Sequence, residues 1–402
     1  MKKSLNNIAP ILGILSIGML SSSLLQPIIP LYLVDIGFSS KATGVLISVL
    51  WLGMVVGESS WGWIADKTGI RIPMIWGTVI SGIILAGFLL AGNTYFAFIA
   101  ILCLGLSRSA LFGPTRGYVG RYSPALKKAA FMGLLLVVGT SFGSLGSFLS
   151  GLIASHLGYF RVFHIAISVY ILGGIITIMI LKGPKFNAPR HLPGKKHSFS
   201  EVWQKYRCIC PLCLITICAY FASGIFISFF PLFITQVLEL DVVFVGIFFT
   251  LKGLIPIVFG VPMGILADRK GKKLFIIAAL MVSAVSMIGI SFSNNFLSLL
   301  IAVVVFSISS VMFNPSASAL LSDIVSSESQ GAAMGIYGGI CENAGIMAGA
   351  FAGGFIWNIF GPQATFWAGT LACALGIILC LNLNTEKIMN INKDLNLVAE
   401  KK

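Results

Sequence analysis

The sequence predicts an all-α integral membrane protein with twelve transmembrane helices, arranged as two parallel repeats of six. Three observations support this prediction: an apolar composition, twelve apolar stretches of spanning length, and a pattern that recurs half a chain later. Of the 402 residues, 57% are hydrophobic and only 10% are charged, whereas charged residues make up about a quarter of an ordinary soluble protein. A chain of this composition is expected to fold within a bilayer.

The apolar stretches are long enough to cross the membrane, which takes about 20 residues of helix. They are Ile8–Leu33, Thr43–Ala65, Ile72–Ala91, Phe96–Tyr118, Ala129–Ala154, Phe160–Leu181, Cys210–Val237, Val243–Leu266, Leu274–Phe292, Phe296–Ile324, Ala332–Asn358 and Ala364–Leu381. Lys2 and Lys3 precede the first stretch as in a signal peptide, but Pro27 and Pro30 stand where a cleavage site would lie. We therefore expect this stretch to be the first span.

The net charge of +14 would suit a nucleic-acid partner, but the distribution of the charges argues against one. With the N-terminus inside, Lys and Arg residues fall at or beyond the inner ends of the helices. The exceptions are Lys41 and Arg161 in outer loops and Arg108, Arg116 and Lys252 within spans. This is the positive-inside distribution, so we expect both termini in the cytoplasm and the basic ends against anionic lipid.

Landmarks recur at an offset of about 202 positions, which indicates an internal repeat. The pairs are Pro30 and Pro231, Gly44 and Gly246, Asp66 and Asp268, Pro114 and Pro315, and Gly133 and Gly335. We expect six-helix bundles at residues 1–181 and 210–385, a linker at 182–209 and a cytoplasmic tail at 386–402. Six is even, so both halves have the same orientation, and transporters built from such repeats bind their substrate near the midplane.

The turn between the second and third helices of each half carries the same charged motif. Its first copy consists of Gly62, Asp66, Lys67, Gly69 and Arg71, and its second of Gly264, Asp268, Arg269, Gly271 and Lys273. An Asp at the C-terminus of its own helix is unfavourably placed against the helix dipole, and it would be stabilised beside the N-terminus of another helix. Each Gly lies one turn before its Asp, so we expect a neighbouring helix to approach closely there.

With two copies of this motif, the chain resembles the major facilitator superfamily over essentially its whole length. The resemblance implies a twelve-helix secondary transporter. It also implies that each motif Asp holds the cytoplasmic side shut against the other half during part of the transport cycle. The alternative is that the motif only anchors a tight turn at the inner surface.

The expected linker, residues 182–209, is rich in Lys, Arg and Pro. Near its end, Ser198 and Glu201 have the spacing of a helix capping box, and Phe199 and Trp203 fall on one helical face. We expect a flexible connector that ends in a short interfacial helix. A helical extension of the seventh span is the alternative.

No feature of the sequence indicates an enzyme, a metal site or a cofactor. Cys210 and Cys213 form a C-x-x-C pair, but a zinc site needs a second pair of ligands nearby. Gly271 and Lys272 lack the upstream glycine of a phosphate-binding loop and are followed by Lys273 instead of Ser or Thr. We therefore expect an ion or solute gradient to drive transport.

Ionisable residues within predicted spans are costly and mark functional sites. They are Glu58, Arg108, Arg116, Lys252 and Glu342. We expect Arg108, Lys252, Glu58 and Glu342 to contact the substrate or the coupling proton, with Glu342 as the carboxyl group that binds and releases the proton. A structural ion pair between Lys252 and Glu342 is the alternative. For Arg116 we expect a structural role, because it lies two turns or less from the basic inner loop.

These features favour proton-coupled export of amphipathic small molecules by a monomer in a bacterial or archaeal plasma membrane. Uptake of an organic anion is the second hypothesis, because Arg108 and Lys252 would suit a carboxylate or phosphate. A facilitator or solute sensor without coupling is the third. Aromatic side chains favour an amphipathic solute if they face the cavity, and packing is the other explanation for them. They are Tyr32, Tyr220, Phe229, Phe230 and Phe313.

Two departures from the drug-exporting branches of the family weigh against export. The fifth helix, GTSFGSLGSFLSG, lacks the Gly-Pro pair of those branches, and Arg108 lies out of register with their fourth-helix Arg. Both departures concern function and leave the expected fold unchanged.

Overall fold

Twelve helical spans are present in the part of the chain that the structure describes. The computed structural model describes residues 2–90, 94–122, 128–182, 209–325 and 330–383. The spans agree with the apolar stretches of the sequence to within a few residues at each end. The prediction of an all-helical membrane protein with twelve spans is therefore confirmed.

The first half contains six spans, three of which are interrupted. They are α1 (Lys2–Leu25) with α2 (Ile29–Asp35), α3 (Ser40–Thr68), α4 (Arg71–Ile75) with the π-helical η1 (Trp76–Ile80) and α5 (Ser81–Leu89), α6 (Thr94–Ser109) with α7 (Gly113–Tyr122), α8 (Lys128–Leu157) and α9 (Tyr159–Ile180). The break between α6 and α7 has a local cause. Pro114 cannot donate a backbone hydrogen bond, and a tight turn precedes it, in which Leu111 N donates to Arg108 O over 3.1 Å.

The second half repeats this plan. Its spans are α11 (Cys210–Leu232) with η5 (Phe233–Val237), α12 (Val242–Lys270), α13 (Lys272–Ser291), α14 (Phe296–Ile324), α15 (Gln330–Gly335) with η6 (Ile336–Cys341) and α16 (Glu342–Phe360), and α17 (Pro362–Leu381). The π-helical segment η6 comes directly before Glu342. Segments of this kind occur frequently at functional sites.

The ends of α3 and α12 show how the sequence repeat produces a structural repeat. The side chains of Ser39 and Asp241 accept hydrogen bonds from backbone N–H groups in the first turns of α3 and α12, which satisfies donors that a helix start leaves unpaired. Gly69 and Gly271 end the same helices with φ of +87° and +99°, a conformation that glycine adopts without strain. The two ends of α3 and the two ends of α12 are therefore formed by the same kinds of residue: a capping side chain at the start and a glycine at the end.

The outer surface is suited to lipid. Large apolar side chains such as Val261, Phe360 and Leu371 are exposed on the helices, as expected where the solvent is hydrocarbon. Hydroxyl groups within the spans donate to carbonyl groups one turn earlier, as in the 2.8 Å bond from Ser16 Oγ to Leu12 O. Such bonds satisfy polar groups where no water is available.

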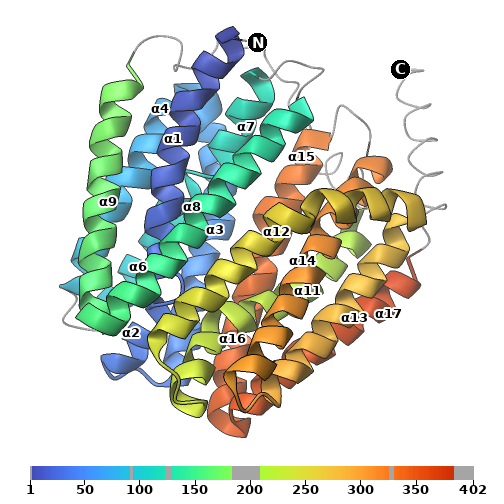
Figure 1. Cartoon of the computed structure of the whole chain (residues 1–402). Coiled ribbons are helices and arrows are strands. Elements are labelled where there is room, and N and C mark those ends of the chain that lie inside the picture. The colour runs from blue at the N-terminus through green and yellow to red at the C-terminus, as the bar shows by residue number, and fades with distance from the viewer. Residues whose placement is uncertain (1, 91–93, 123–127, 183–208, 326–329, 384–402) are drawn as a thin grey trace.

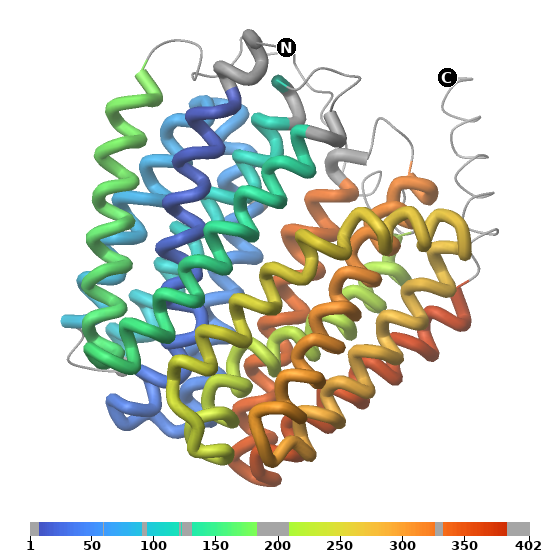
Figure 2. Tube along the Cα trace, in the orientation of Figure 1, coloured from blue at the N-terminus to red at the C-terminus, as the bar shows by residue number. Residues whose placement is uncertain are grey.

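The two halves lie side by side, with α1 to α9 on one side and α11 to α17 on the other (Figure 1). Figure 2 shows that α1, in blue, begins and α17, in red, ends toward the same end of the molecule, which we call the terminal end. The halves meet mainly through α3 against α16 and α8 against α12. These helices diverge toward the terminal end and converge toward the opposite end (Figure 1).

Two glycine pairs join the halves at that opposite end. A Cβ placed on Gly44 of α3 would lie 2.8 Å from the Cα of Gly354 in α16. A Cβ placed on Gly151 of α8 would lie 2.9 Å from the Cα of Gly246 in α12. Only glycine lets helix backbones approach so closely, so we call this the closed end.

Parts of the predicted organisation lie outside the described residues. These are the linker with its interfacial helix before residue 209 and the tail from residue 386. Both stay predictions, as do the bundle boundaries at residues 181 and 210 and the cytoplasmic position of the termini.

Candidate functional site

A cavity of about 350 Å³ lies between the two halves, on the terminal side of the glycine contacts. Helices α1, α3, α6, α7 and α8 line it from the first half, and α12, η6 and α16 from the second. Glu58, Arg108, Lys252 and Glu342, the four residues expected to act on substrate or proton, all line this cavity. The structure thus brings them together, and their functions stay predictions.

Three of the side chains in this cavity form a charge cluster: Glu58 of α3, Arg116 of α7 and Glu342 of α16. Glu342 interacts electrostatically with Arg116 and Glu58 and lies near Tyr220, whose hydroxyl donates to Asn314 Oδ1 over 3.0 Å. Glu58 interacts electrostatically with Arg116 and lies near Asn343, whose Nδ2 donates to Gly339 O over 2.8 Å. The charge cluster therefore spans both halves.

Two consecutive glycines of η6 let this charge cluster reach the backbone of the second half. A Cβ placed on Gly339 would lie 2.8 Å from Glu58 Oε2, and one on Gly338 would lie 3.2 Å from Arg116 Nη1. The charged ends of two first-half side chains thus pack against bare backbone, one turn before Glu342.

Arg116 is the cavity residue that sequence reasoning missed. We expected it to have only a structural role near the basic inner loop, but it lines the cavity together with Glu58 and Glu342. Its distance along the chain from the inner loop did not reveal on which side of the helix it lies. The available signal was its spacing from Arg108, because residues eight apart share a face of a continuous helix.

Arg108 lies in the last turn of α6, directly before the turn that precedes Pro114. Its side chain is only 8% exposed, and its Nε has no hydrogen-bond partner among the described residues. The Arg108 side chain interacts electrostatically with the Tyr170 hydroxyl. This hydroxyl lies 2.8 Å from Ser22 Oγ.

Lys252 lies among three aromatic rings of the second half. Its Nζ is 4.7 Å from the ring centroid of Phe226, 5.7 Å from that of Phe306 and 6.0 Å from that of Phe249. Such rings attract a cation through their negative faces. Within the described part of the chain Lys252 has no carboxylate partner, so the alternative ion pair with Glu342 does not form in this conformation.

A side chamber of about 210 Å³ adjoins the cavity within the second half, and Lys252 and Ile346 line both spaces. Of the aromatic residues that the sequence singled out, Tyr220 and Phe313 line this chamber. The remaining three, Tyr32, Phe229 and Phe230, are buried in the hydrophobic core. Both explanations for these aromatic residues therefore hold, each for some of them.

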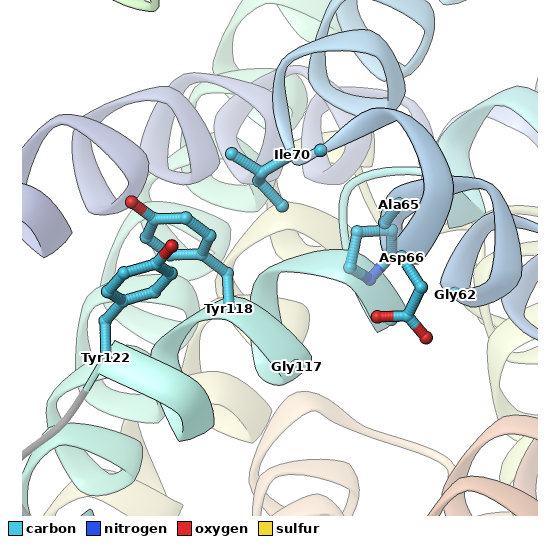
Figure 3. Close-up of a pocket in the computed structure, with 10 residues that line it drawn as sticks. Gly62, Ala65, Asp66, Ile70, Gly117, Tyr118 and Tyr122 are labelled. Atoms are coloured by element: carbon cyan, nitrogen blue, oxygen red, sulfur yellow. The ribbon is translucent and has the colours of Figure 1, made fainter. Parts of the chain in front are cut away.

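The first copy of the charged motif borders a pocket of about 130 Å³ at the terminal end. Gly62, Asp66 and Gly69 line it together with Tyr118 and Tyr122 of α7, and Figure 3 shows these side chains around the pocket. No described residue comes within 4 Å of a Cβ placed on Gly62. The close helix approach expected at this glycine is therefore absent in this conformation.

The cations of the first copy lie apart from one another. Lys67 Nζ is 3.5 Å from the ring centroid of Trp63 in the preceding turn. Arg71 begins α4, and its Nε is buried without a hydrogen-bond partner among the described residues.

The second copy of the motif ties helices together within its own half. Lys273 Nζ donates to the carbonyl oxygens of Leu381 and Leu383 over 3.0 Å and 2.8 Å, at the end of α17. Lys272, which follows Gly271, pairs with Asp323 of α14 over 2.6 Å. These contacts neutralise helix C-termini.

The remaining residues of the second copy are exposed or have no closely packed neighbour. Asp268 and Arg269 are exposed in the last turn of α12. The described atom nearest to a Cβ placed on Gly264 is Pro315 Cβ, at 4.0 Å, so no helix packs tightly there either. Gating by the two motif Asp residues stays a prediction.

Cys210 and Cys213, the C-x-x-C pair of the sequence, lie in the first turn of α11. Cys213 is close to Cys341 of η6. Among the described residues, no group of His, Cys, Asp and Glu has an arrangement that would hold a metal ion.

Comparison with known protein families identifies the family to which this chain belongs. The sequence model of the Major Facilitator Superfamily matches residues 11–209 and 212–394. The chain belongs to the Major Facilitator Superfamily. It is therefore a multi-pass membrane transporter of small molecules, and the resemblance drawn from the charged motif is confirmed.

Curated relatives in this superfamily include multidrug resistance proteins. The chain is 28% identical to the multidrug resistance protein MdtG of Escherichia fergusonii over 284 residues, which cover 67% of this chain and 68% of the relative. It is 25% identical to MdtG of Salmonella heidelberg over 287 residues, which cover 67% and 69%.

Solved superfamily structures share the fold. A POT family transporter in complex with a thioalcohol-conjugated peptide aligns with a TM-score of 0.77 at 13% identity, covering 95% of this chain and 96% of that one. A bacterial homologue of the human lysosomal transporter Spinster, in an inward-facing and unoccupied conformation, aligns with a TM-score of 0.76 at 13% identity, covering 97% and 96%.

Proposed function

We propose that this superfamily member exports amphipathic small molecules in exchange for protons. The name of the two relatives, multidrug resistance protein, supports export of drug-like solutes. The mixed polar and aromatic lining of the cavity and the side chamber supports an amphipathic solute. We further propose that the protein works as a monomer in a bacterial or archaeal plasma membrane, with the terminal end in the cytoplasm.

The observation that carries the proposal is the charge cluster between the halves. Glu58 and Arg116 contact the backbone of η6 only while the halves keep their present relative position. A proton bound by Glu58 or Glu342 changes the attraction of these carboxyl groups to Arg116. Binding and release of a proton is thereby linked to the position of the halves, as alternating access requires.

The charged motif is expected to act in the opposite state of the transport cycle, in which the terminal end is closed. In this conformation the two glycine pairs close one end, and the pocket at Asp66 is open. When the halves rock the other way, we expect the terminal end to close over this pocket, with Asp66 and Asp268 stabilising the closed state.

Proteoliposomes with a trapped pH indicator test the proposal. Panels of organic cations and organic anions are added under an imposed proton gradient, with wild type beside Glu342→Gln. Glu239→Gln is the matched control, because Glu239 lies in a loop outside the spans. We expect a solute-dependent proton flux that Glu342→Gln abolishes and Glu239→Gln retains.

Two other outcomes identify the alternative functions. Solute and protons moving in the same direction would indicate uptake, for which the cations Arg108 and Lys252 would select an organic anion. Solute movement that is independent of protons and equal in all three proteins would indicate a facilitator and contradict the coupling proposal.

A further inference from the structure

Arg108 and Lys252 are the cavity cations that lack a carboxylate partner among the described residues. Arg108 comes from α6 of the first half and Lys252 from α12 of the second, so they face the same cavity from opposite halves. The third cation, Arg116, interacts electrostatically with both cavity carboxylates, Glu58 and Glu342. The cavity therefore has one region that holds both carboxylates with a single cation and a cationic region that holds Arg108 and Lys252.

The cationic region lies nearer the closed end. At 1.5 Å per residue, Lys252 is about 15 Å from the start of α12 and Arg108 about 21 Å from the start of α6. Glu58 is about 27 Å from the start of α3. All three helices start at the closed end, so a solute entering from the terminal end passes the charge cluster before it reaches Arg108 and Lys252.

Among the described residues, neither cation has a carboxylate that neutralises it. Arg108 is 92% buried, and its Nε donates to no described residue. Lys252 lies among the rings of Phe226, Phe249 and Phe306. Burying an unpaired cation and leaving a donor unsatisfied both cost free energy. An anion bound between the two would satisfy both groups.

The side chamber offers space for the rest of such a ligand. It begins at Lys252, and Ile227, Pro256, Phe306 and Phe313 give it apolar surface. Its volume of about 210 Å³ suits a compact ring system. An apolar lining with a few fixed polar groups is typical of small-molecule sites.

We propose that Arg108 and Lys252 form an anion site, and that the solute is an amphipathic carboxylate or phosphate. Its anionic group lies between the two cations, and its apolar part occupies the side chamber. That this ligand is the transported solute rests on the proposed function, but the site itself does not.

Equilibrium binding tests the site without a proton gradient, so its failure is separable from failure of transport. The full chain is placed in nanodiscs of zwitterionic lipid, which keeps anionic headgroups out of the comparison. Calorimetry measures the affinity for 1-naphthylacetate and for its neutral isostere 1-naphthylacetamide. We expect the carboxylate to bind at least about tenfold more tightly than the amide, and acetate alone to compete at least about tenfold more weakly.

Variants assign this preference to the two cations. Arg108→Gln and Lys252→Gln should each reduce the preference for the carboxylate several-fold and leave amide binding nearly unchanged, and the double variant should abolish it. Arg108→Lys should restore most of the preference, and it keeps the test decisive if Arg108→Gln does not fold. Arg161→Gln, an exposed arginine of α9, is the matched control.

Three results would overturn the proposal. They are equal affinity of wild type for the carboxylate and the amide, tighter binding of 1-naphthylmethylammonium than of either, and a preference that survives in the double variant. Absence of carboxylate binding to wild type at about 10 mM, an affinity too weak for a built site, would also overturn it.

Discussion

At the scale of single residues, the neighbours of each buried charge determine what it can do. Arg116 interacts electrostatically with Glu58 and Glu342, whereas Lys252 lies among phenylalanine rings. Arg108 keeps an unsatisfied donor. Uncompensated charge is unfavourable within a membrane. We therefore expect Arg116 to act with the two carboxylates in coupling, and Arg108 and Lys252 to bind an anion.

Replacing Arg116 by Ala should uncouple transport. The substitution leaves Glu58 and Glu342 facing each other without a cation, so we expect the rate of proton-coupled transport to fall at least about tenfold. Arg116→Lys keeps the charge and should retain most of the rate. Initial rates in proteoliposomes measure the effect, with Arg161→Ala as the control. Wild-type rates in Arg116→Ala would exclude this residue from the coupling mechanism.

Replacing Lys273 by Ala should destabilise the second half. The lost hydrogen bonds to the carbonyl oxygens of Leu381 and Leu383 correspond to about 1–3 kcal/mol for a charged donor. Thermal unfolding in detergent measures the change. Lys270→Ala, an exposed lysine in the preceding turn, should leave the unfolding midpoint in place. Equal midpoints for both variants would contradict the capping role of Lys273.

At the scale of helices, glycine positions determine which surfaces can meet. Gly44 and Gly354 bring α3 against α16, and Gly151 and Gly246 bring α8 against α12. Gly338 and Gly339 in η6 serve another purpose, because they admit side chains from the first half. The same residue type therefore closes one end of the cavity and shapes its interior.

Replacing Gly246 by Leu should prevent closure of this end. Its side chain would start 2.8 Å from the carbonyl oxygen of Ser147 and 2.9 Å from the Cα of Gly151, so α8 and α12 must separate. We expect transport to fall at least about tenfold while the protein still folds, because closely packed interfaces rarely tolerate added volume. Gly260→Leu in the same helix is the control, since no described atom lies within 4 Å of its Cβ. Gel filtration checks that both variants fold. Equal transport rates for the two variants would show that α8 and α12 can separate without loss of transport.

At the scale of the whole molecule, the structure represents one state of a cycle. The halves are joined at the closed end and diverge toward the terminal end (Figure 1). A solute bound in the cavity can leave through the closed end only after the glycine pairs separate. The contact between the halves is therefore expected to break in every cycle.

A reversible cross-link across the closed end tests this requirement. Lys41 Nζ of the first half lies 4.6 Å from the ring centroid of Phe355 in the second. Both residues are changed to Cys after the eight native cysteines are replaced by Ser or Ala, and a bifunctional methanethiosulfonate joins them. We expect transport to stop and to recover after reduction, with each single-Cys variant unaffected. Continued transport by the cross-linked protein would mean that this end does not need to open.

The sequence by itself determined the features that depend on local chemistry. Apolar stretches such as Cys210–Val237 determine the twelve spans, because hydrocarbon requires continuous apolar helices. The offset of about 202 between Asp66 and Asp268 determined the repeat and indicated the family. The sequence also gives each ionisable residue a position along its helix, from which we expect its depth in the membrane to follow.

Only the tertiary structure decided which of these residues meet. It joined Arg116 to Glu58 and Glu342 and separated Glu342 from Lys252, because such pairing depends on the rotation of each helix about its axis. It also decided which end is closed, since the contact between Gly44 and Gly354 depends on how the two halves lie against each other. When every face of a membrane helix is apolar, the spacing of apolar residues reveals neither the rotation of the helix about its axis nor the way in which the halves meet.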